Sequence, residues 1–188
     1  MVKISYRGKV VLLGAPSVGK TSLLARYVDD TFSTEYHQTV GANFLIKEVD
    51  LKNVINNLNL NNPNLSKDIQ EKGFKLFFWD LGGQVQSLFA NEYYFVQAVG
   101  AMVIFSLIDK STFEQIEFWI QKLKELSGEV PFVIVGNKSD LNIVIEEEEI
   151  KTMTQKFGVP YFETSAKLDK NVQASFETLS TLILNSLK

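Results

Sequence analysis

Short runs of hydrophobic residues recur along the chain, and each run has about the length of a single β-strand. The runs are rich in β-branched and aromatic side chains, a composition that favours strands. They occupy residues 9–14, 43–51, 74–80, 101–107, 131–137 and 160–165. This pattern predicts a sheet of about six strands.

Segments with helical periodicity lie between most of these runs. Apolar residues recur along one helix face from Phe113 to Leu126, and again from Val172 to Ile183. Strands that alternate with helices predict an α/β fold, with a mostly parallel sheet and helices on both faces. The one direct strand-to-strand connection, over residues 51–74, indicates an antiparallel strand at one edge of that sheet.

Residues 52–73 differ in composition from the rest of the chain. The segment is rich in asparagine, with one proline and a few scattered leucines. Such a composition is typical of a solvated loop or an extended hairpin, and an insert that binds a partner is the alternative. A chain of 188 residues has room for one substantial core. We therefore predict a single domain over residues 1–188, with this insert between its second and third strands.

Charge and composition exclude several classes of function. The net charge is −3 and the sequence pI about 5.3, so a basic surface for nucleic acid is not expected. The absence of cysteine excludes disulfides and prenylation, and the sequence has no myristoylation or signal-peptide pattern. The longest apolar stretch, 99–108, is about half of a membrane span. We expect a cytoplasmic protein without a lipid anchor, recruited to membranes only through partners.

The stretch GAPSVGKT, residues 14–21, lies between a predicted strand and a predicted helix. It satisfies the pattern GxxxxGK[ST], in which backbone amides and the helix N-terminus bind phosphate groups. Lys20 would reach the β- and γ-phosphates and Thr21 would ligate Mg²⁺. A glycine-rich turn before a helix is the simpler alternative. The predicted phosphate contacts are Gly14, Ala15, Pro16, Ser17, Val18, Gly19, Lys20, Thr21 and Ser22.

Asp80 ends an apolar strand in the stretch FFWDLGGQ. A carboxylate at the end of a buried strand can hold Mg²⁺ beside a phosphate loop, because open α/β sheets bind ligands at that edge. By itself such an aspartate would more simply form a turn. Together with residues 14–21 it predicts a metal site of Thr21 and Asp80.

Two further polar motifs each follow a predicted strand. They are NKSD at 137–140 and TSAK at 164–167. The Asp140 carboxylate can accept hydrogen bonds from N1 and N2 of guanine, whereas adenine has neither donor. An unpaired buried carboxylate is costly, so this pattern favours guanine.

In their order and spacing, these motifs resemble those of the Ras-superfamily small GTPases. The resemblance covers GxxxxGK[ST], a threonine before Gly41, DLGGQ, NKSD and SAK, and so extends over nearly the whole chain. It implies the P-loop NTPase (small G-protein) fold. It also implies GTP and GDP as ligands, with Mg²⁺ as the metal.

The resemblance also assigns roles to individual residues. Phe32 corresponds to the aromatic beside the guanine, and Thr39 to the threonine that ligates Mg²⁺ and senses the γ-phosphate. Gly83 corresponds to the glycine whose amide meets that phosphate, Gln84 to the glutamine that orients the attacking water, and Ala166 to the backbone donor to the guanine oxygen. The catalytic group is thus predicted to be Gln84, Lys20, Thr39 and Gly83, and the metal ligands Thr21, Thr39 and Asp80. The remaining predicted nucleotide contacts are Tyr36, Asn137, Lys138, Asp140, Ser165 and Lys167.

Within the superfamily the features are mixed. The stretch STFEQIEFWIQKLKEL and the Thr-Val-Gly at 39–41 resemble Rab proteins, while WDLGGQ resembles the Arf pattern. The assignment is therefore Rab-like or divergent Ras-like. Val85 stands where Ras and Rab proteins usually have a glutamate that takes part in nucleotide exchange. The sequence ends with the last predicted helix, so the family's lipidated tail is not expected, and a truncated chain is the alternative.

The function that follows is a molecular switch that hydrolyses GTP slowly and changes its two switch loops. Its expected partners are effectors, exchange proteins and activating proteins, and it is expected to act as a monomer. The alternatives are a GTP-bound interaction module with negligible hydrolysis and a P-loop kinase. Gln84 argues against the first, and the guanine motifs argue against the second.

Three other features have simpler interpretations. His37 on a polar loop is expected to be solvated. Glu146–Glu149 is expected to begin a helix, where acidic side chains interact well with the helix dipole. At least one of Phe118 and Trp119 is expected to pack in the core.

Overall fold

A computed structural model of the chain describes residues 6–34, 42–47, 74–81 and 92–186. Several predictions concern residues outside these ranges and remain predictions. They are the insert at 52–73, the single-domain organisation that includes it, and the roles of Tyr36, His37, Thr39, Gly83, Gln84 and Val85.

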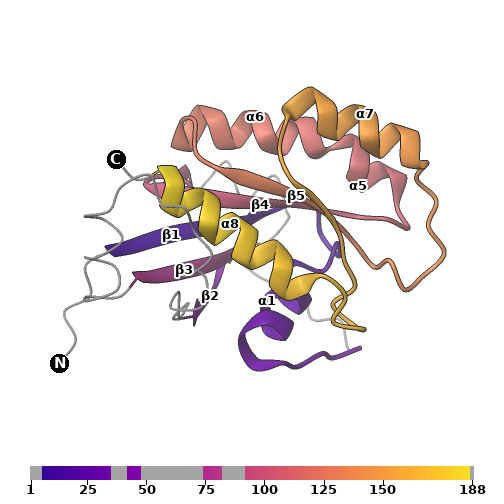
Figure 1. Cartoon of the computed structure of the whole chain (residues 1–188), viewed down its shortest axis with the longest axis horizontal. Helices are drawn as coiled ribbons and strands as arrows, with labels where there is room; N and C mark the ends of the chain where they lie inside the picture. Colours follow the sequence, from indigo (N-terminus) through magenta and orange to yellow (C-terminus); the bar gives the residue numbers. More distant parts are fainter. Residues whose placement is uncertain (1–5, 35–41, 48–73, 82–91, 187–188) are drawn as a thin grey trace.

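The sheet has six strands in the order β2-β3-β1-β4-β5-β6. Their bounds are β1 Tyr6–Leu13, β2 Ala42–Lys47, β3 Phe74–Leu81, β4 Ala98–Ser106, β5 Phe132–Asn137 and β6 Tyr161–Glu163. All neighbouring pairs are parallel except β2 with β3, which is antiparallel and lies at the edge. The predicted α/β fold with one antiparallel edge strand is confirmed (Figure 1).

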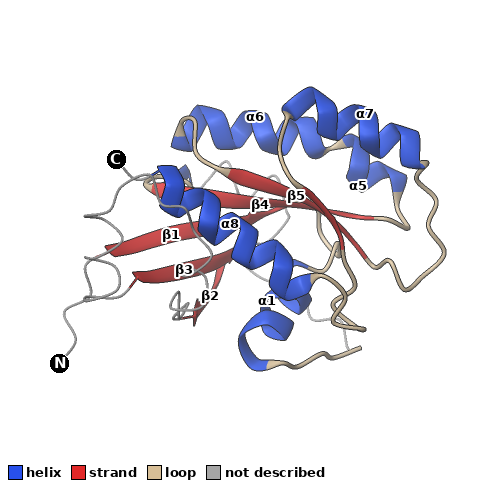
Figure 2. Ribbon diagram, in the orientation of Figure 1, coloured by secondary structure: helices blue, strands red, loops and turns tan. Residues whose placement is uncertain are grey.

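Helices cover both faces of this sheet, as Figure 2 shows. Their bounds are α1 Lys20–Asp29, α5 Lys110–Glu114, α6 Ile116–Ser127, α7 Glu147–Phe157 and α8 Val172–Ser186, with a short 3₁₀ helix, η1, at Glu92–Tyr94. The stripe predicted from Phe113 to Leu126 is divided between α5 and α6 at Gln115. Periodicity did not reveal this break because the apolar face continues across it. No helix in the described ranges has the length and hydrophobicity to cross a bilayer.

The side chains of each central strand alternate between two hydrophobic cores. In β1, Val10 and Leu12 pack with α1 and α8, while Val11 and Leu13 pack with the layer of α5, α6 and α7. Successive side chains of a strand point to opposite faces, so a strand buried on both faces must be continuously apolar. This explains why the hydrophobic runs in the sequence are unbroken.

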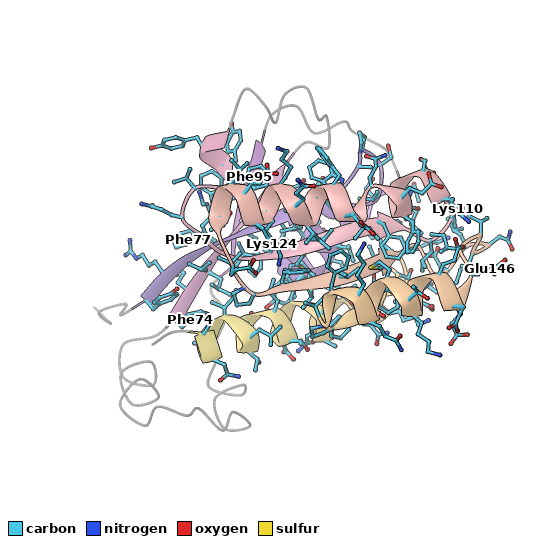
Figure 3. The ribbon with its side chains drawn as sticks, turned by 90° about the horizontal axis from the view of Figure 1, so that it is seen from above. Phe74, Phe77, Phe95, Lys110, Lys124 and Glu146 are labelled. Atoms are coloured by element: carbon cyan, nitrogen blue, oxygen red, sulfur yellow. The ribbon has the colours of Figure 1, made fainter. Side chains whose placement is uncertain are left out.

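The simpler interpretations of Trp119 and of Glu146–Glu149 are confirmed. Trp119 is 2% exposed and lies in the core. Glu146 is the N-cap of α7 and forms a capping box with Glu149. Glu149 also pairs with Lys110 at 2.8 Å, which joins the beginnings of α5 and α7 at the end of the molecule where Figure 3 labels Lys110 and Glu146.

Within the described residues, the largest differences from the predicted strand boundaries are in β1, β4 and β6. β1 begins at Tyr6, three residues before the predicted start. β4 begins at Ala98, three residues before the predicted start, and β6 ends at Glu163, before Thr164 and Ser165. The Thr164 N–H still donates to the Gly136 carbonyl of β5, and the side chains of Thr164 and Ser165 take part in a polar network at the edge of the sheet, described below. The strand propensities of Thr164 and Ser165 give no indication of that network.

The close packing around Gly136 in β5 leads to a specific prediction for stability. A Cβ added there would lie 2.6 Å from the Tyr161 hydroxyl and 2.9 Å from the Phe105 ring. We expect Gly136→Ala to lower the free energy of unfolding by about 1–3 kcal/mol, the usual penalty of overpacking. Chemical denaturation would measure it.

Tyr161→Phe is the matched control. The Tyr161 hydroxyl is buried and has no hydrogen-bond partner among the described residues, so its removal should change stability by less than about 0.5 kcal/mol. In the Tyr161→Phe background the penalty of Gly136→Ala should shrink by about 1 kcal/mol, because one of the two close contacts is gone. An unchanged penalty would contradict the steric explanation.

Candidate functional site

The candidate site lies where β1, β3, β5 and β6 end. The order of the sheet places β1 between β3 and β4. The chain leads from β1 to β2 and β3 on one side of it, and then returns to β4 on the other side. In open α/β sheets, ligands bind at such a reversal, beside the carboxyl ends of the strands. The motifs within the described residues lie at these strand ends or directly after them.

The loop after β1 is shaped by two glycines with positive φ. Gly14 has φ 145°, and a Cβ there would lie 2.1 Å from the carbonyl oxygen of Ile104. Gly19 has φ 96°, and its Cβ would lie 2.3 Å from the Asn137 side-chain nitrogen. Both the backbone conformation and the space therefore require glycine at these two positions. The spacing GxxxxG is explained by close contact with β4 on one side and β5 on the other.

The loop leads directly into the N-terminus of α1. Gly19 is the N-cap and has no side chain to satisfy the first amides of the helix. Those amides and the positive end of the helix dipole form a site for an anion. Pro16 and Ser17 are exposed in the same loop, and Pro16 contributes no amide donor.

Lys20 extends into this loop and is 6% exposed. Its ammonium donates to the carbonyl oxygens of Gly14 and Ala15, each at 2.9 Å. Burial lowers the pKa of Lys20 from 10.5 to about 8, and the nearby Asp80 carboxylate acts in the opposite direction. A buried cation held by two neutral carbonyls is well placed to bind an anionic phosphate.

Thr21 and Asp80 lie in contact across the site. The Thr21 hydroxyl donates to a carboxylate oxygen of Asp80, which is completely buried at the end of β3. A hydroxyl and a carboxylate are hard oxygen donors of the kind that Mg²⁺ takes, usually one or two per site and beside phosphate oxygens. The chemistry of these two residues therefore fits the predicted metal.

Asn137 connects the phosphate loop to the other half of the site. Its amide nitrogen donates to the Val18 carbonyl at 2.9 Å. Its amide oxygen accepts from the Thr164 hydroxyl at 3.2 Å and from the Ala166 backbone N–H at 3.3 Å. One buried side chain thus fixes the loop after β1 relative to the loop after β6.

Asp140 is positioned by Ser165. The Ser165 hydroxyl donates to a carboxylate oxygen of Asp140 at 2.6 Å and accepts from the Leu168 N–H at 3.1 Å. Lys138 precedes the aspartate with φ 70°, and this turn brings residues 138–140 to the loop after β6. The carboxylate therefore has a defined orientation before any ligand is bound.

The remaining predicted contacts within the described residues lie around these groups. Phe32 is partly buried and packs against the core beneath α1 and α8. Ala15, Val18 and Ala166 are buried, while Lys167 is exposed. The structure thus brings together the described part of the predicted site, while the catalytic roles of Thr39, Gly83 and Gln84 remain predictions.

Sequence reasoning missed Arg26 as a part of this region. Its guanidinium reaches from α1 to the loop after β6 and donates to the Ala166 carbonyl at 3.0 Å. The available signal was an arginine four residues before Asp30, which indicates an ion pair at a helix end but not a contact with a distant loop.

A comparison with protein families identifies one that matches nearly the whole chain. The model described as Ras family matches residues 9–185. This range includes all the motifs described above.

Curated proteins of similar sequence come from plants, slime moulds and yeast. Ras-related protein RABA4b of Arabidopsis thaliana is 33% identical over 98% of this chain and 76% of its own length. Ras-related protein Rab-1A of Dictyostelium discoideum is 34% identical over 97% of this chain and 83% of its own length. Ras-related protein SEC4 of Saccharomyces cerevisiae is 33% identical over 93% of this chain and 74% of its own length.

Proposed function

The chain belongs to the Ras family as a Rab-like small GTPase, and we propose that it is a switch that binds GTP and GDP with Mg²⁺ and hydrolyses GTP slowly. In this proposal the γ-phosphate holds two loops, at Thr39 and Gly83, and its loss releases them. The surface available to partners then changes with the nucleotide.

The observation that carries the proposal is the bridging position of Asn137. Its two amide atoms bond to the phosphate loop after β1, at Val18, and to the loop after β6, here named the base loop, at Ala166. A phosphate site and a base site that are joined by one buried side chain support a ligand with both parts. Asp140 supplies the acceptor that favours guanine among the nucleotides.

Catalysis in this proposal depends on position and charge. Lys20 and the loop amides stabilise charge on the β,γ-phosphate end, and Thr21 with Asp80 would hold the metal. Mg²⁺, when bound, neutralises charge on the phosphate oxygens. Gln84 would orient the water that attacks the γ-phosphate, and no covalent intermediate is needed.

The partners and location follow from the same proposal. We expect effectors of the GTP-bound state, together with exchange and activating proteins, to bind the switch loops. We also expect a cytoplasmic monomer that reaches membranes through its partners, in agreement with the family assignment. The alternative is an interaction module that binds GTP with negligible hydrolysis.

Single-turnover hydrolysis distinguishes these two functions. We expect wild-type protein loaded with GTP to form GDP and phosphate at a slow rate, on the order of the 10⁻⁴ to 10⁻³ per second known for unaided Ras. Gln84→Leu should slow this rate by about 10-fold or more, because the attacking water loses its orientation. Quenched samples analysed for GDP would give both rates.

Gln86→Leu is the matched control, because it makes the same change two residues away. It should leave the hydrolysis rate within about 2-fold of wild type. If Gln84→Leu hydrolyses GTP as fast as wild type, the proposed role of Gln84 is wrong. If GTP binds but no GDP forms, the interaction module is the correct function.

A further inference from the structure

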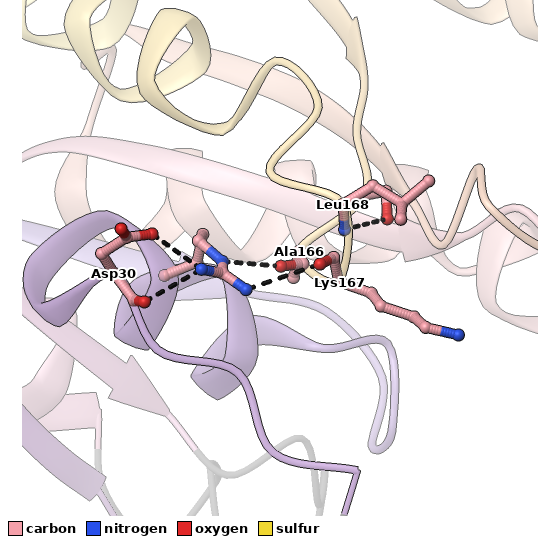
Figure 4. A network of polar contacts seen from close by, with 6 residues as sticks. Asp30, Ala166, Lys167 and Leu168 are labelled. Atoms are coloured by element: carbon pink, nitrogen blue, oxygen red, sulfur yellow. Dashed lines mark hydrogen bonds and ion pairs between the residues drawn. The ribbon is translucent and has the colours of Figure 1, made fainter.

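Arg26 joins the end of α1 to the loop after β6 through all three of its guanidinium nitrogens. Nε donates to the Ala166 carbonyl at 3.0 Å and Nη2 to the Lys167 carbonyl at 3.4 Å. Nη1 donates to the carbonyl and carboxylate oxygens of Asp30, at 2.9 and 2.7 Å. Figure 4 shows these contacts as the dashed lines between Asp30 on one side and Ala166 and Lys167 on the other.

Of the contacts that Arg26 makes, those with the loop after β6 contribute more to stability than the ion pair with Asp30. The Arg26 side chain is 16% exposed, whereas that of Asp30 is 84% exposed. An ion pair with so exposed a carboxylate contributes little, because water screens it. Hydrogen bonds from a cation to two consecutive backbone carbonyls are charge-assisted and therefore stronger. Asp30 and the C-terminal end of α1 keep the guanidinium in place, and its fork is directed at the loop.

The bonds from Arg26 to these two carbonyls also restrict the orientation of the Ala166 N–H. The Ala166 carbonyl belongs to the peptide that follows Ala166, and its N–H belongs to the peptide that precedes it. Both peptides are planar, so only the two torsions at Ala166 relate them. Asn137 already accepts from this N–H at 3.3 Å, and Ala166 is buried. The Ala166 N–H thus lies against the Asn137 amide oxygen, while Arg26 holds the carbonyl on the other side of the Ala166 Cα.

We propose that Arg26 is a positioning residue for the guanine base, which holds the Ala166 N–H in the orientation that donates to O6 of the bound nucleotide. The inference rests on the proposed function, because it concerns the same site and its ligand. It adds that α1, whose N-terminus contributes to the phosphate site, also controls the base site through its last turn. Guanine recognition then depends on a residue that does not itself contact the base.

The test combines two protein variants with three nucleotides. Arg26→Met keeps an unbranched side chain but removes every donor, and Arg7→Met makes the same change at the chain's other arginine, which is exposed at the start of β1. GDP is compared with 6-thio-GDP, which replaces O6 by sulfur, and with IDP, which lacks the N2 amine opposite Asp140. Dissociation rates and equilibrium affinities are measured in the presence of Mg²⁺, with full-length protein.

Arg26→Met should release GDP about 10-fold faster than wild type, and Arg7→Met at the wild-type rate. The preference for GDP over 6-thio-GDP should fall by about 3-fold or more in Arg26→Met, because the amide no longer meets O6 in the correct orientation. The preference for GDP over IDP should stay within about 2-fold of wild type, because it depends on Asp140. A purely structural role would weaken all three nucleotides equally and leave both preferences unchanged.

The outcomes separate this inference from the proposed function. If wild-type protein does not bind GDP, the proposed function fails, and this inference with it. If wild type binds GDP but Arg26→Met keeps the wild-type preference over 6-thio-GDP, only the inference fails. Should Arg26→Met not fold, as judged by circular dichroism, Arg26→Lys takes its place, because it keeps the charge but not the fork. Arg26→Lys should then reduce the same preference, and a wild-type preference would overturn the inference.

Discussion

Asp140→Asn should change the base preference of the protein from guanine to xanthine. Wild type should bind GDP about 10³-fold or more tightly than XDP, and the variant should prefer XDP. The Asp140 carboxylate accepts from the N1 and N2 donors of guanine, but it would face an oxygen at C2 of xanthine. A site built for hydrogen bonds rejects a ligand that leaves its polar groups unpaired by factors of this size.

The contact with Ser165 explains why the variant should prefer xanthine. Its hydroxyl donates to one oxygen of Asp140 at 2.6 Å, so an amide in that place should turn its oxygen toward Ser165. The amide nitrogen is then free to donate to the C2 oxygen of xanthine. Competition of GDP, XDP and ADP against a fluorescent nucleotide would measure the three affinities.

Asp169→Asn is the matched control for this prediction. Asp169 lies in the loop after β6, which also contains Ser165. Its φ is 55°, a conformation that asparagine also adopts, and its side chain is exposed. It should leave the preference for GDP unchanged. Equal affinities of wild type for GDP and ADP, or a variant that still prefers GDP, would contradict the role of Asp140.

Lys20→Met should have opposite effects on nucleotide binding and on the stability of the nucleotide-free protein. Affinity for GTP should fall by about 100-fold or more, because the variant loses a buried charge-assisted contact with phosphate. The free energy of unfolding should instead rise by about 1–2 kcal/mol at pH 7. This combination would identify Lys20 as a residue kept for binding at the expense of stability.

The gain in stability follows from the burial of Lys20. Its pKa of about 8 instead of 10.5 means that the charged side chain lowers the free energy of unfolding by roughly 3 kcal/mol at neutral pH. Loss of its hydrogen bonds to the Gly14 and Ala15 carbonyls offsets about 1–2 kcal/mol of the gain. The remainder is the expected stabilisation.

Denaturation of nucleotide-free protein and titration with GTP would measure the two effects separately. Bound nucleotide must be removed first, because it stabilises the folded state by mass action. Lys151→Met, which removes an exposed lysine paired with Glu148, is the control and should change neither quantity appreciably. A Lys20→Met protein that is less stable than wild type would show that the two carbonyl contacts outweigh the burial of charge.

The chemistry of the phosphate loop could be predicted from the sequence because it is local. Gly14 to Thr21 are consecutive, and the strand before them and the helix after them are evident from hydrophobic periodicity. The same holds for the unbroken apolar strands, since burial on both faces leaves no polar positions in the pattern. The antiparallel edge strand could be predicted because no pattern of helical periodicity separates the hydrophobic runs at 43–51 and 74–80.

Other features could not be predicted because they depend on segments that are distant in the sequence. Gly136 is required by the Tyr161 hydroxyl and the Phe105 ring, which come from neighbouring strands. Thr164 and Ser165 have residue types that suit a strand, but they follow the end of β6 and their side chains bond to Asn137 and Asp140. Strand propensity is a local property and cannot indicate these contacts, because only the packing of the strands brings the partners together.

Arg26 shows most directly why the tertiary structure was needed. Its partners in the base loop are the backbone carbonyls of Ala166 and Lys167, 140 and 141 residues away in sequence. Every residue carries such a carbonyl, so no pattern of side chains in the sequence marks these two as acceptors. The sequence determined that a cation would stand near the end of α1, since Arg26 and Asp30 are four residues apart. Only the stacking of α1 and α8 on the same face of the sheet decided that this cation would meet the base loop.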